Sequence, residues 1–258
     1  MSDNSKIEWT NASWSPVVGC TKCSPGCLNC YAERMAKRLK AMGQRNYRNG
    51  FEVTCHPHVL DMPLKWKKPR MIFVCSMSDL FHPKVPFEFI DKVMAVITLC
   101  PQHTFQVLTK RIDRMLEYFN LRSKSANYWK KAVPLGRTLE WRGFSLVPFP
   151  LPNLWLGVSI CTSEEKRNIE ILKQISAAVR FVSFEPLLCD MGDINLDGIN
   201  WVIVGGESGP KKRECKLEWV QSIVDQCKTV NVPVFVKQIH VDGKLYKMPP
   251  YFPQEYPK

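Results

Sequence analysis

The stretch Gly19-Cys20-Thr21-Lys22-Cys23-Ser24-Pro25-Gly26-Cys27-Leu28-Asn29-Cys30-Tyr31-Ala32 holds four of the eleven cysteines of this 258-residue chain. Pro25 and Gly26 interrupt regular secondary structure, so we expect these cysteines to lie on a loop. Thiolates spaced this closely can converge on a metal ion or cluster without ligands from distant segments. The other seven cysteines are dispersed, several of them within apolar runs, and most are predicted to be core thiols.

Several ligand sets are compatible with this loop. Cys23, Cys27 and Cys30 form a C-x3-C-x2-C pattern, whereas Cys20, Cys27 and Cys30 form C-x6-C-x2-C. All four thiols could instead bind zinc, but structural zinc sites usually join two separated C-x2-C turns, and here only three residues lie between the turns. Three thiolates on a loop favour an iron–sulfur cluster with one iron left open. Zinc and unligated thiols remain alternatives, because spacing does not identify a metal.

Apolar runs and helical patterns alternate along most of the chain. A short strand within residues 7–14 leads to the cysteine loop, and a helix follows the loop and ends at Gly43. Further strands are predicted at 71–75, 104–108, 154–158, 179–184, 201–204 and 232–236. Such alternation is typical of parallel βα units, and nearly continuous apolar strands indicate burial on both faces. The predicted fold class is therefore α/β, a full or partial parallel (βα) barrel with about six βα units.

We expect a single domain over residues 1–258. Residues 122–153 lose periodicity and contain four prolines, which indicates an insertion or a lid. Residues 241–258 are punctuated by glycine and proline and are predicted to form a C-terminal tail. The sequence lacks an apolar run long enough to cross a bilayer and lacks the apolar core of a signal peptide, so we expect a cytoplasmic protein without a membrane partner.

Basic residues outnumber acidic ones and give the chain a net charge of +12. They are concentrated in residues 34–70, with ten Lys or Arg against two acids, and in residues 110–142, with nine against three. This excess favours a polyanionic partner, and nucleic acid or a nucleotide is the candidate. A solvated surface that keeps the protein soluble is the alternative, since net charge does not locate a site.

Polar residues follow each predicted strand. The carboxyl ends of parallel strands meet at one rim, in closed barrels and in open sheets alike. We therefore expect these side chains to line a pocket beside the cysteine loop, although surface ion pairing is an alternative for the charged ones. They are Ser76 and Asp79, Lys110, Ser159, Glu185, Glu207 and Lys237.

Motifs spread over most of residues 7–240 resemble those of the radical S-adenosylmethionine superfamily. The closest resemblance is to a phage-associated family with a three-cysteine motif, which is distantly similar to spore photoproduct lyase. The motifs are Glu8-Trp9-Thr10, Gly19–Glu33, Ser76–Phe81, Leu108–Arg111, Leu156–Ser159, Ser183–Leu187, Gly205–Pro210 and Lys237-Gln238.

This resemblance implies a [4Fe-4S] cluster whose open iron binds S-adenosylmethionine, together with an electron donor that reduces the cluster. In the family the motif selects Cys20, Cys27 and Cys30 as ligands, whereas the commonest spacing in the wider superfamily selects Cys23 in place of Cys20. The phage association implies a location in the host cytoplasm. The family has no settled substrate, and the sequence identifies no protein partner.

The resemblance also implies roles for residues at the strand ends. Ser76, Ser78 and Asp79 lie where superfamily members bind the methionine amine, and a helix-capping turn, in which Ser and Asp are favoured, is the alternative. Gly205-Gly206-Glu207 resembles the amine-binding Gly-Gly-Glu of the superfamily but follows a later strand. It is assigned to cofactor or substrate, with a simple turn as the alternative.

The remaining strand-end residues complete the expected cofactor pocket. Ser159 is expected to bind the ribose or the methionine carboxylate, and Lys110, Glu185 and Lys237 are expected to face the cofactor. The leading hypothesis is thus an iron–sulfur enzyme that reductively cleaves S-adenosylmethionine and acts on nucleic acid or a nucleotide, in repair or base modification. A noncatalytic, zinc-stabilised protein that binds nucleic acid is the competing hypothesis.

Overall fold

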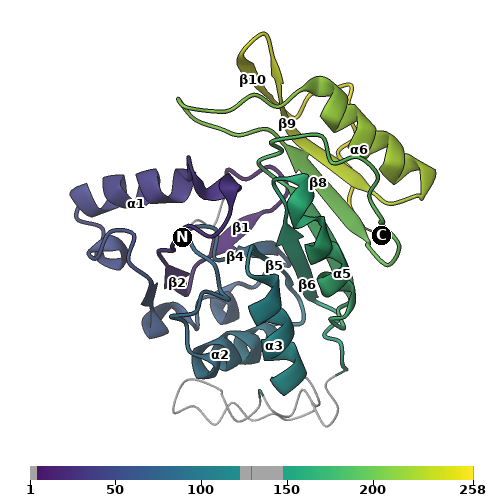
Figure 1. Ribbon diagram of the computed structural model, residues 1–258. Coiled ribbons are helices and arrows are strands. Elements are labelled where there is room, and N and C mark those ends of the chain that lie inside the picture. Colours follow the sequence, from purple (N-terminus) through teal and green to yellow (C-terminus); the bar gives the residue numbers. More distant parts are fainter. Residues whose placement is uncertain (1–4, 123–128, 130–147, 258) are drawn as a thin grey trace.

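The computed structural model describes residues 5–122, 129 and 148–257 (Figure 1). Within these residues an eight-stranded sheet has the order β1-β4-β5-β6-β7-β8-β9-β10. Its strands are β1 (Ala12–Trp14), β4 (Met71–Val74), β5 (Thr104–Thr109), β6 (Leu154–Ser159), β7 (Val179–Phe184), β8 (Trp201–Gly205), β9 (Val234–Val241) and β10 (Lys244–Lys247). All neighbours from β1 to β9 are parallel, and β10 is antiparallel to β9. A separate two-stranded sheet pairs β2 (Val17–Val18) with β3 (Thr54–Cys55).

The helices follow the predicted strand–helix alternation. They are α1 (Tyr31–Ala41), α2 (Phe87–Thr98), α3 (Ile112–Arg122), α5 (Arg167–Lys173) and α6 (Leu217–Thr229). Short 3-10 turns are η1 (Pro25–Cys27), η2 (Arg45–Tyr47), η3 (Pro57–Val59), η4 (Pro63–Lys65) and η5 (Ser163–Lys166). None of the helices in the described ranges has the length and apolar character to cross a membrane.

The strand order explains why one face of the sheet is open. Each strand of the large sheet lies beside the strand that precedes it in that sheet along the chain. Parallel connections are almost always right-handed, so strands added in one direction place their helices on the same face. Figure 1 shows α2, α3, α5 and α6 along one side of the curled sheet. The predicted partial barrel is therefore confirmed as a half-barrel, and the described strands do not form the closed alternative.

Alternating side chains divide the strands between two cores. Leu156, Val182 and Val204 belong to the large core that includes residues of α2, α3 and α6. Phe181, next to Val182, and Ile203, next to Val204, point to the opposite, concave face of the sheet. They form a second cluster there together with Trp9, Phe73, Trp201 and Phe235. The half-barrel is thus filled by aromatic rings at one level, and polar residues follow at the carboxyl ends of the strands.

The C-terminal residues differ from the tail that was predicted for 241–258. Strand β9 continues to Val241, and β10 returns beside it as a hairpin. Asp242 and Gly243, which connect them, have φ values of 48° and 71°. An Asp-Gly pair adopts such positive φ angles readily and promotes tight hairpins, a signal that the sequence interpretation overlooked. As a result, Lys237 lies within a strand instead of after one.

The predicted insertion at 122–153 falls largely outside the described residues, which exclude 123–128 and 130–147, and it stays a prediction. Trp129 within it is buried, and its Nε1 donates a hydrogen bond to Tyr118 Oη at 2.9 Å. Tyr118 Oη in turn donates to Asp91 Oδ1 at 2.9 Å. The side chain of Trp129 therefore packs onto α2 and α3.

Candidate functional site

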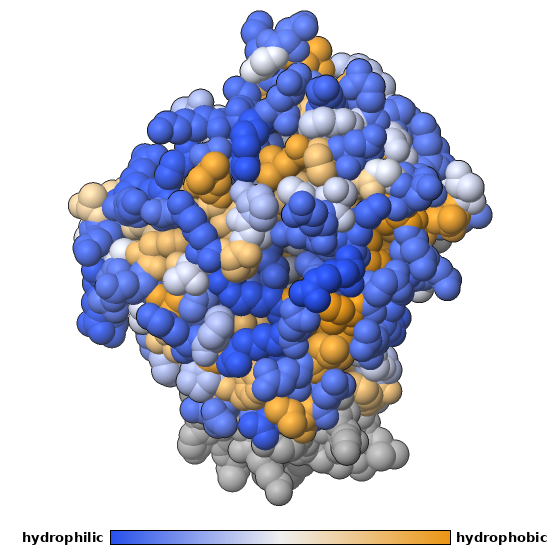
Figure 2. Space-filling view, viewed as in Figure 1, coloured by the Kyte–Doolittle hydropathy of each residue, from blue (hydrophilic) through white to orange (hydrophobic). Residues whose placement is uncertain are grey.

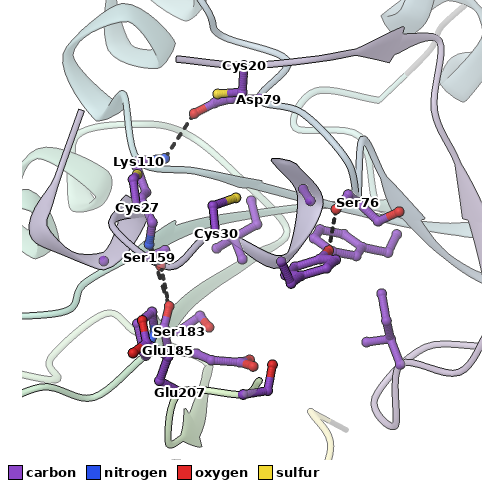
Figure 3. A pocket seen from close by; sticks show the side chains of 18 of the residues that line it. Cys20, Cys27, Cys30, Ser76, Asp79, Lys110, Ser159, Ser183, Glu185 and Glu207 are labelled. Carbon is purple, nitrogen blue, oxygen red and sulfur yellow. Dashed lines mark hydrogen bonds between the residues drawn. The ribbon is translucent and has the colours of Figure 1, made fainter. Parts of the chain in front are cut away.

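A pocket of about 530 Å³ lies at the carboxyl ends of the strands, beside the cysteine loop (Figure 3). All but one of the residues predicted from the sequence to form the site line this pocket, and the exception is Gly205. The lining residues among them are Cys20, Cys23, Cys27, Cys30, Ser76, Ser78, Asp79, Lys110, Ser159, Glu185, Gly206, Glu207 and Lys237. The structure thus brings together residues that lie up to 217 positions apart in the sequence, from Cys20 to Lys237.

The cysteine loop is anchored by its backbone at the start and by a turn in the middle. Gly19 forms a parallel bridge with Ser78, and the amide of Cys20 donates to the carbonyl of Phe51 at 3.2 Å. Ser24 caps η1 by accepting a hydrogen bond from the amide of Gly26 at 3.1 Å. Helix α1 then begins at Tyr31, directly after Cys30.

Gly26 is the point at which the loop touches the sheet. A Cβ atom at this position would lie 2.2 Å from Cys161 Sγ and 3.3 Å from Pro186. Only glycine therefore lets the loop backbone approach the ends of β6 and β7 this closely. Cys161, which the sequence suggested to be a core thiol, is buried, and its sulfur also lies 3.1 Å from Lys110 Nζ.

The four loop thiols differ in their surroundings although all of them line the pocket. Cys23 is exposed, whereas Cys20, Cys27 and Cys30 are half-buried. A hydrogen bond from Cys23 outweighs burial and lowers the pKa of Cys27 to about 5, which favours the thiolate that metals bind. Burial raises the pKa of Cys20. In the described parts of the chain, no three His, Cys, Asp or Glu side chains are gathered as a site for a single metal ion.

Asp79 joins the segment after β4 to the end of β5. Its buried carboxylate accepts hydrogen bonds from the amide of Phe81 at 2.9 Å, from Thr109 Oγ1 at 2.8 Å and from the amide of Lys110 at 3.2 Å. Arg111 Nη1 completes the set at 3.0 Å. The carboxylate of Asp79 is therefore occupied by protein groups on both of its oxygens.

Arg111 connects this carboxylate to the start of the cysteine loop. Its Nη2 donates to the carbonyl of Thr21 at 2.8 Å, and its Nη1 lies 3.4 Å from Cys20 Sγ. Thr21 Oγ1 accepts from the same guanidinium at 3.2 Å and is 2.8 Å from His82 Nε2. Figure 3 shows Cys20 next to Asp79 at one end of the pocket.

Glu207 lies near the end of the cysteine loop, and its carboxylate is held by protein donors as that of Asp79 is near the start of the loop. Its carboxylate accepts from Asn29 Nδ2 at 2.9 Å and from the amide, Nε and Nη2 of Arg213 at 2.8, 3.0 and 2.6 Å. Arg213 Nη1 also donates to the carbonyl of Pro25 at 3.0 Å. Burial opposes ionisation of Glu207, but the hydrogen bonds from Arg213 and Asn29 outweigh it and lower the pKa of this carboxyl.

The centre of the pocket holds a second group of charges. Lys110 Nζ donates to Ser159 Oγ, and Ser159 Oγ donates to the carbonyl of Glu185 at 2.9 Å. The carboxylate of Glu185 pairs with Lys237. In the described structure Lys237 is its one hydrogen-bonding partner, so Glu185 keeps acceptor capacity that Asp79 and Glu207 have already used.

The serine residues of the pocket differ in whether the described residues supply them with hydrogen-bond partners. Ser78 Oγ donates to the carbonyl of Val17 at 2.7 Å, and the carbonyl of Ser76 accepts from the hydroxyl of Tyr31. Ser183 lines the pocket as well, and its buried Oγ has no hydrogen-bond partner among the described residues. A buried hydroxyl without a partner is costly, which indicates that a ligand or water completes the site.

Sequence reasoning missed four residues that shape this site. Arg111 belongs to one of the quoted motifs, but no role was assigned to it, and Arg213 lies in a basic run without any distinguishing signal. Asn29 could have been noticed, since it separates two cysteines and an amide can bridge groups on a loop. Ser183 begins another of the quoted motifs but was given no role, and the alternation of faces along β7 is a further signal that marks it as a pocket residue.

Comparison with known proteins gives one structural and one family-level match. No curated protein matches the sequence. A solved structure of spore photoproduct lyase complexed with dinucleoside spore photoproduct is similar at 8% sequence identity and a TM-score of 0.38. The similarity covers 81% of this chain, and the chain spans 58% of the length of that structure. The family described as "Protein of unknown function (DUF5131)" matches residues 4–247, and the chain therefore belongs to this family.

Proposed function

We propose that this protein is an iron–sulfur enzyme of the radical S-adenosylmethionine type that acts on nucleic acid or a nucleotide. Cys20, Cys27 and Cys30 would hold a [4Fe-4S] cluster, and the cofactor would bind beside it. The observation that carries the proposal is that the loop thiols and the polar strand ends line the same pocket. A bound cluster, reduced by an external electron donor, would supply the electron for cleavage of S-adenosylmethionine into methionine and a 5′-deoxyadenosyl radical.

The donor set supports a cluster over zinc. Cys20, Cys27 and Cys30 line one pocket, and three thiolates leave one iron of a four-iron cluster open for a cofactor. A four-iron cluster separates its thiolates farther than one zinc ion does, because each thiolate binds a different iron. Lys110 and Arg111 contribute positive charge near Cys27 and Cys20, which suits a ligand set of thiolates.

Charges at the centre of the pocket suit the zwitterionic end of the cofactor. Glu185 can accept from an ammonium group, while Lys110 and Lys237 can donate to a carboxylate. Ser159 and Ser183 offer hydroxyls at neighbouring positions of β6 and β7. Asp79 and Glu207 are less suited to bind an ammonium, since protein donors already occupy both of their oxygens.

The aromatic layer below this site supports radical chemistry in a second way. Trp9 and Phe73 belong to the buried concave cluster and also line the pocket. A floor of large apolar rings limits the water that can reach a reactive intermediate. The protein residues would thus bind and orient the cofactor and shield it from solvent.

Anaerobic reconstitution tests the proposal. We expect a brown protein with about four irons per chain, and 5′-deoxyadenosine after addition of dithionite and S-adenosylmethionine. A colourless protein that binds stoichiometric zinc under the same conditions would instead support the noncatalytic alternative. An intact cluster without any 5′-deoxyadenosine would contradict cofactor cleavage.

The surface around the pocket supports a nucleic-acid substrate. Leu28, Tyr31 and Met35 are 60%, 45% and 41% exposed, and the last two line the pocket. Of these, Tyr31 is aromatic, and exposed aromatic side chains beside basic residues are typical of surfaces on which bases stack. Lys6 adds positive charge to the pocket lining, whereas Lys247 in the same lining pairs with Glu8 at 2.7 Å. Figure 2 shows a largely hydrophilic face with separate apolar patches.

Salt dependence of binding tests the substrate class. The net charge of +12 predicts that the protein retains DNA or RNA oligonucleotides at low salt, with affinity that falls steeply as salt rises. Unpaired strands should bind more tightly than duplex, because stacking requires exposed bases. Fluorescence anisotropy with labelled single-stranded and duplex oligonucleotides measures both effects. Negligible affinity for all of them at low salt would rule out this substrate class.

A further inference from the structure

We propose that two arginine–carboxylate pairs with buried carboxylates, Asp79–Arg111 and Glu207–Arg213, position the cysteine loop for ligand binding before any cluster is present. We refer to these pairs as the loop clamps. The identity of the ligand, an iron–sulfur cluster, rests on the proposed function. The contacts of the loop clamps with the cysteine loop do not depend on it. Arg111 and Arg213 are therefore assigned as positioning residues.

Both clamps act on the backbone of the loop. Arg111 donates to the carbonyl of Thr21 at 2.8 Å, and Arg213 donates to the carbonyl of Pro25 at 3.0 Å. Thr21 directly follows Cys20, and Pro25 lies two residues before Cys27. Because the acceptors are carbonyls, these bonds constrain the path of the chain and not merely one side chain.

Asn29 extends the second clamp to the last cysteine. Its Nδ2 donates to Glu207 Oε2 at 2.9 Å and also lies 2.8 Å from the carbonyl of Lys211. Asn29 lies between Cys27 and Cys30, so the clamps contact the loop near each of the three proposed ligands. The segment from Cys20 to Cys30 is thus fixed near its start, middle and end.

Burial makes these pairs stronger than ordinary surface ion pairs. The side chains of Asp79 and Glu207 are 7% and 5% exposed, and those of Arg111 and Arg213 are 11% and 31% exposed. A planar guanidinium can bind a carboxylate with one arm and a carbonyl with another. Breaking such a pair leaves a charge buried without its partner, which is strongly unfavourable.

The loop needs this support because it has little core of its own. The turn η1, which forms the middle of the loop, has no fully buried residue, and Cys23 is exposed. Fixing the backbone of each residue costs about 1–2 kcal/mol in conformational entropy, so an unsupported loop of this composition would fluctuate. The clamps supply the fixed geometry from rigid elements, since Arg111 precedes α3 and Glu207 follows β8.

Hydrogen exchange of the metal-free, full-length protein tests the clamps. Arg111→Lys and Arg213→Lys keep the positive charge but lose the second arm of the guanidinium. We expect amide exchange of residues 20–30 to accelerate about tenfold in each variant, as for loss of one hydrogen bond to a charged group. Loaded protein should also release iron to a chelator about tenfold faster, if release follows opening of the loop.

Arg167→Lys is the matched control, because Arg167 and Asp113 form an exposed pair 3.5 Å apart with side chains 71% and 70% exposed. It should leave the loop unchanged, and unchanged thermal unfolding of all three variants would exclude a global effect. Loop exchange within about twofold of wild type in both clamp variants would overturn the proposal, as hydrogen bonds to charged groups are worth more than that. Failure of wild type to bind iron would contradict the proposed function and leave the exchange result intact.

Discussion

Replacing Cys27 or Cys30 with alanine should abolish cluster binding, lowering iron from about four per chain to nearly none after anaerobic reconstitution. Each variant removes one of three thiolates, and a cluster held by two is easily lost. Both residues belong to the C-x3-C-x2-C pattern and to the C-x6-C-x2-C pattern, so the effect does not depend on the choice between Cys20 and Cys23. Iron and sulfide content, together with the brown colour of the cluster, measures the loss.

The same measurement distinguishes the third ligand. Cys20 lies 3.4 Å from Arg111 Nη1, whereas Cys23 is exposed. We therefore expect Cys20→Ala to lose the cluster and Cys23→Ala to keep it. Cys189→Ala is the control, since this half-buried thiol does not line the pocket. Full iron content in Cys27→Ala would show that the loop is not the cluster site.

Much of the fold could be predicted because periodicity reports burial directly. The strand predicted at 179–184 is observed as β7, and the helix expected to end at Gly43 is α1. The observed ends of strands and helices differ from the predicted ones where tertiary contacts determine them. The strand expected within 7–14 is reduced to Ala12–Trp14, since Trp9 fills the concave face of the sheet instead of extending β1. Periodicity cannot reveal a residue that leaves its strand to fill a cavity.

The location of the site could be predicted from the sequence, but the role of each residue in it could be predicted less well. Parallel topology alone brings Ser159, Glu185 and Lys237 to one rim. The motif resemblance assigned Asp79 and Glu207 to the cofactor, yet both carboxylates are occupied by arginines and other protein donors. Arg111 and Arg213 were not assigned, because pairing across 32 or 6 residues depends on how the loop folds back over the sheet. Sequence identifies which charges are near the site and not which of them neutralise each other.

Among the pocket carboxylates, Glu185 should matter most for binding S-adenosylmethionine. Glu185→Gln removes the negative charge but keeps the size of the side chain, and it leaves Lys237 without its ion-pair partner. Loss of a charged hydrogen bond to the cofactor ammonium should weaken binding about 10- to 100-fold. Equilibrium dialysis of cofactor with the reconstituted protein measures the change.

Two further variants separate binding from loop support. Glu164→Gln makes the same chemical change at an exposed site outside the pocket lining and should leave the affinity unchanged. Glu207→Gln weakens the contacts that connect Glu207 to Asn29 and, through Arg213, to Pro25. It should therefore accelerate iron release, whereas protein that keeps its full cluster should bind the cofactor with little change in affinity. Equal affinity in Glu185→Gln and wild type would instead mean that another acceptor binds the ammonium. A larger loss of affinity in Glu207→Gln than in Glu185→Gln would identify Glu207 as that acceptor, as the motif resemblance implied.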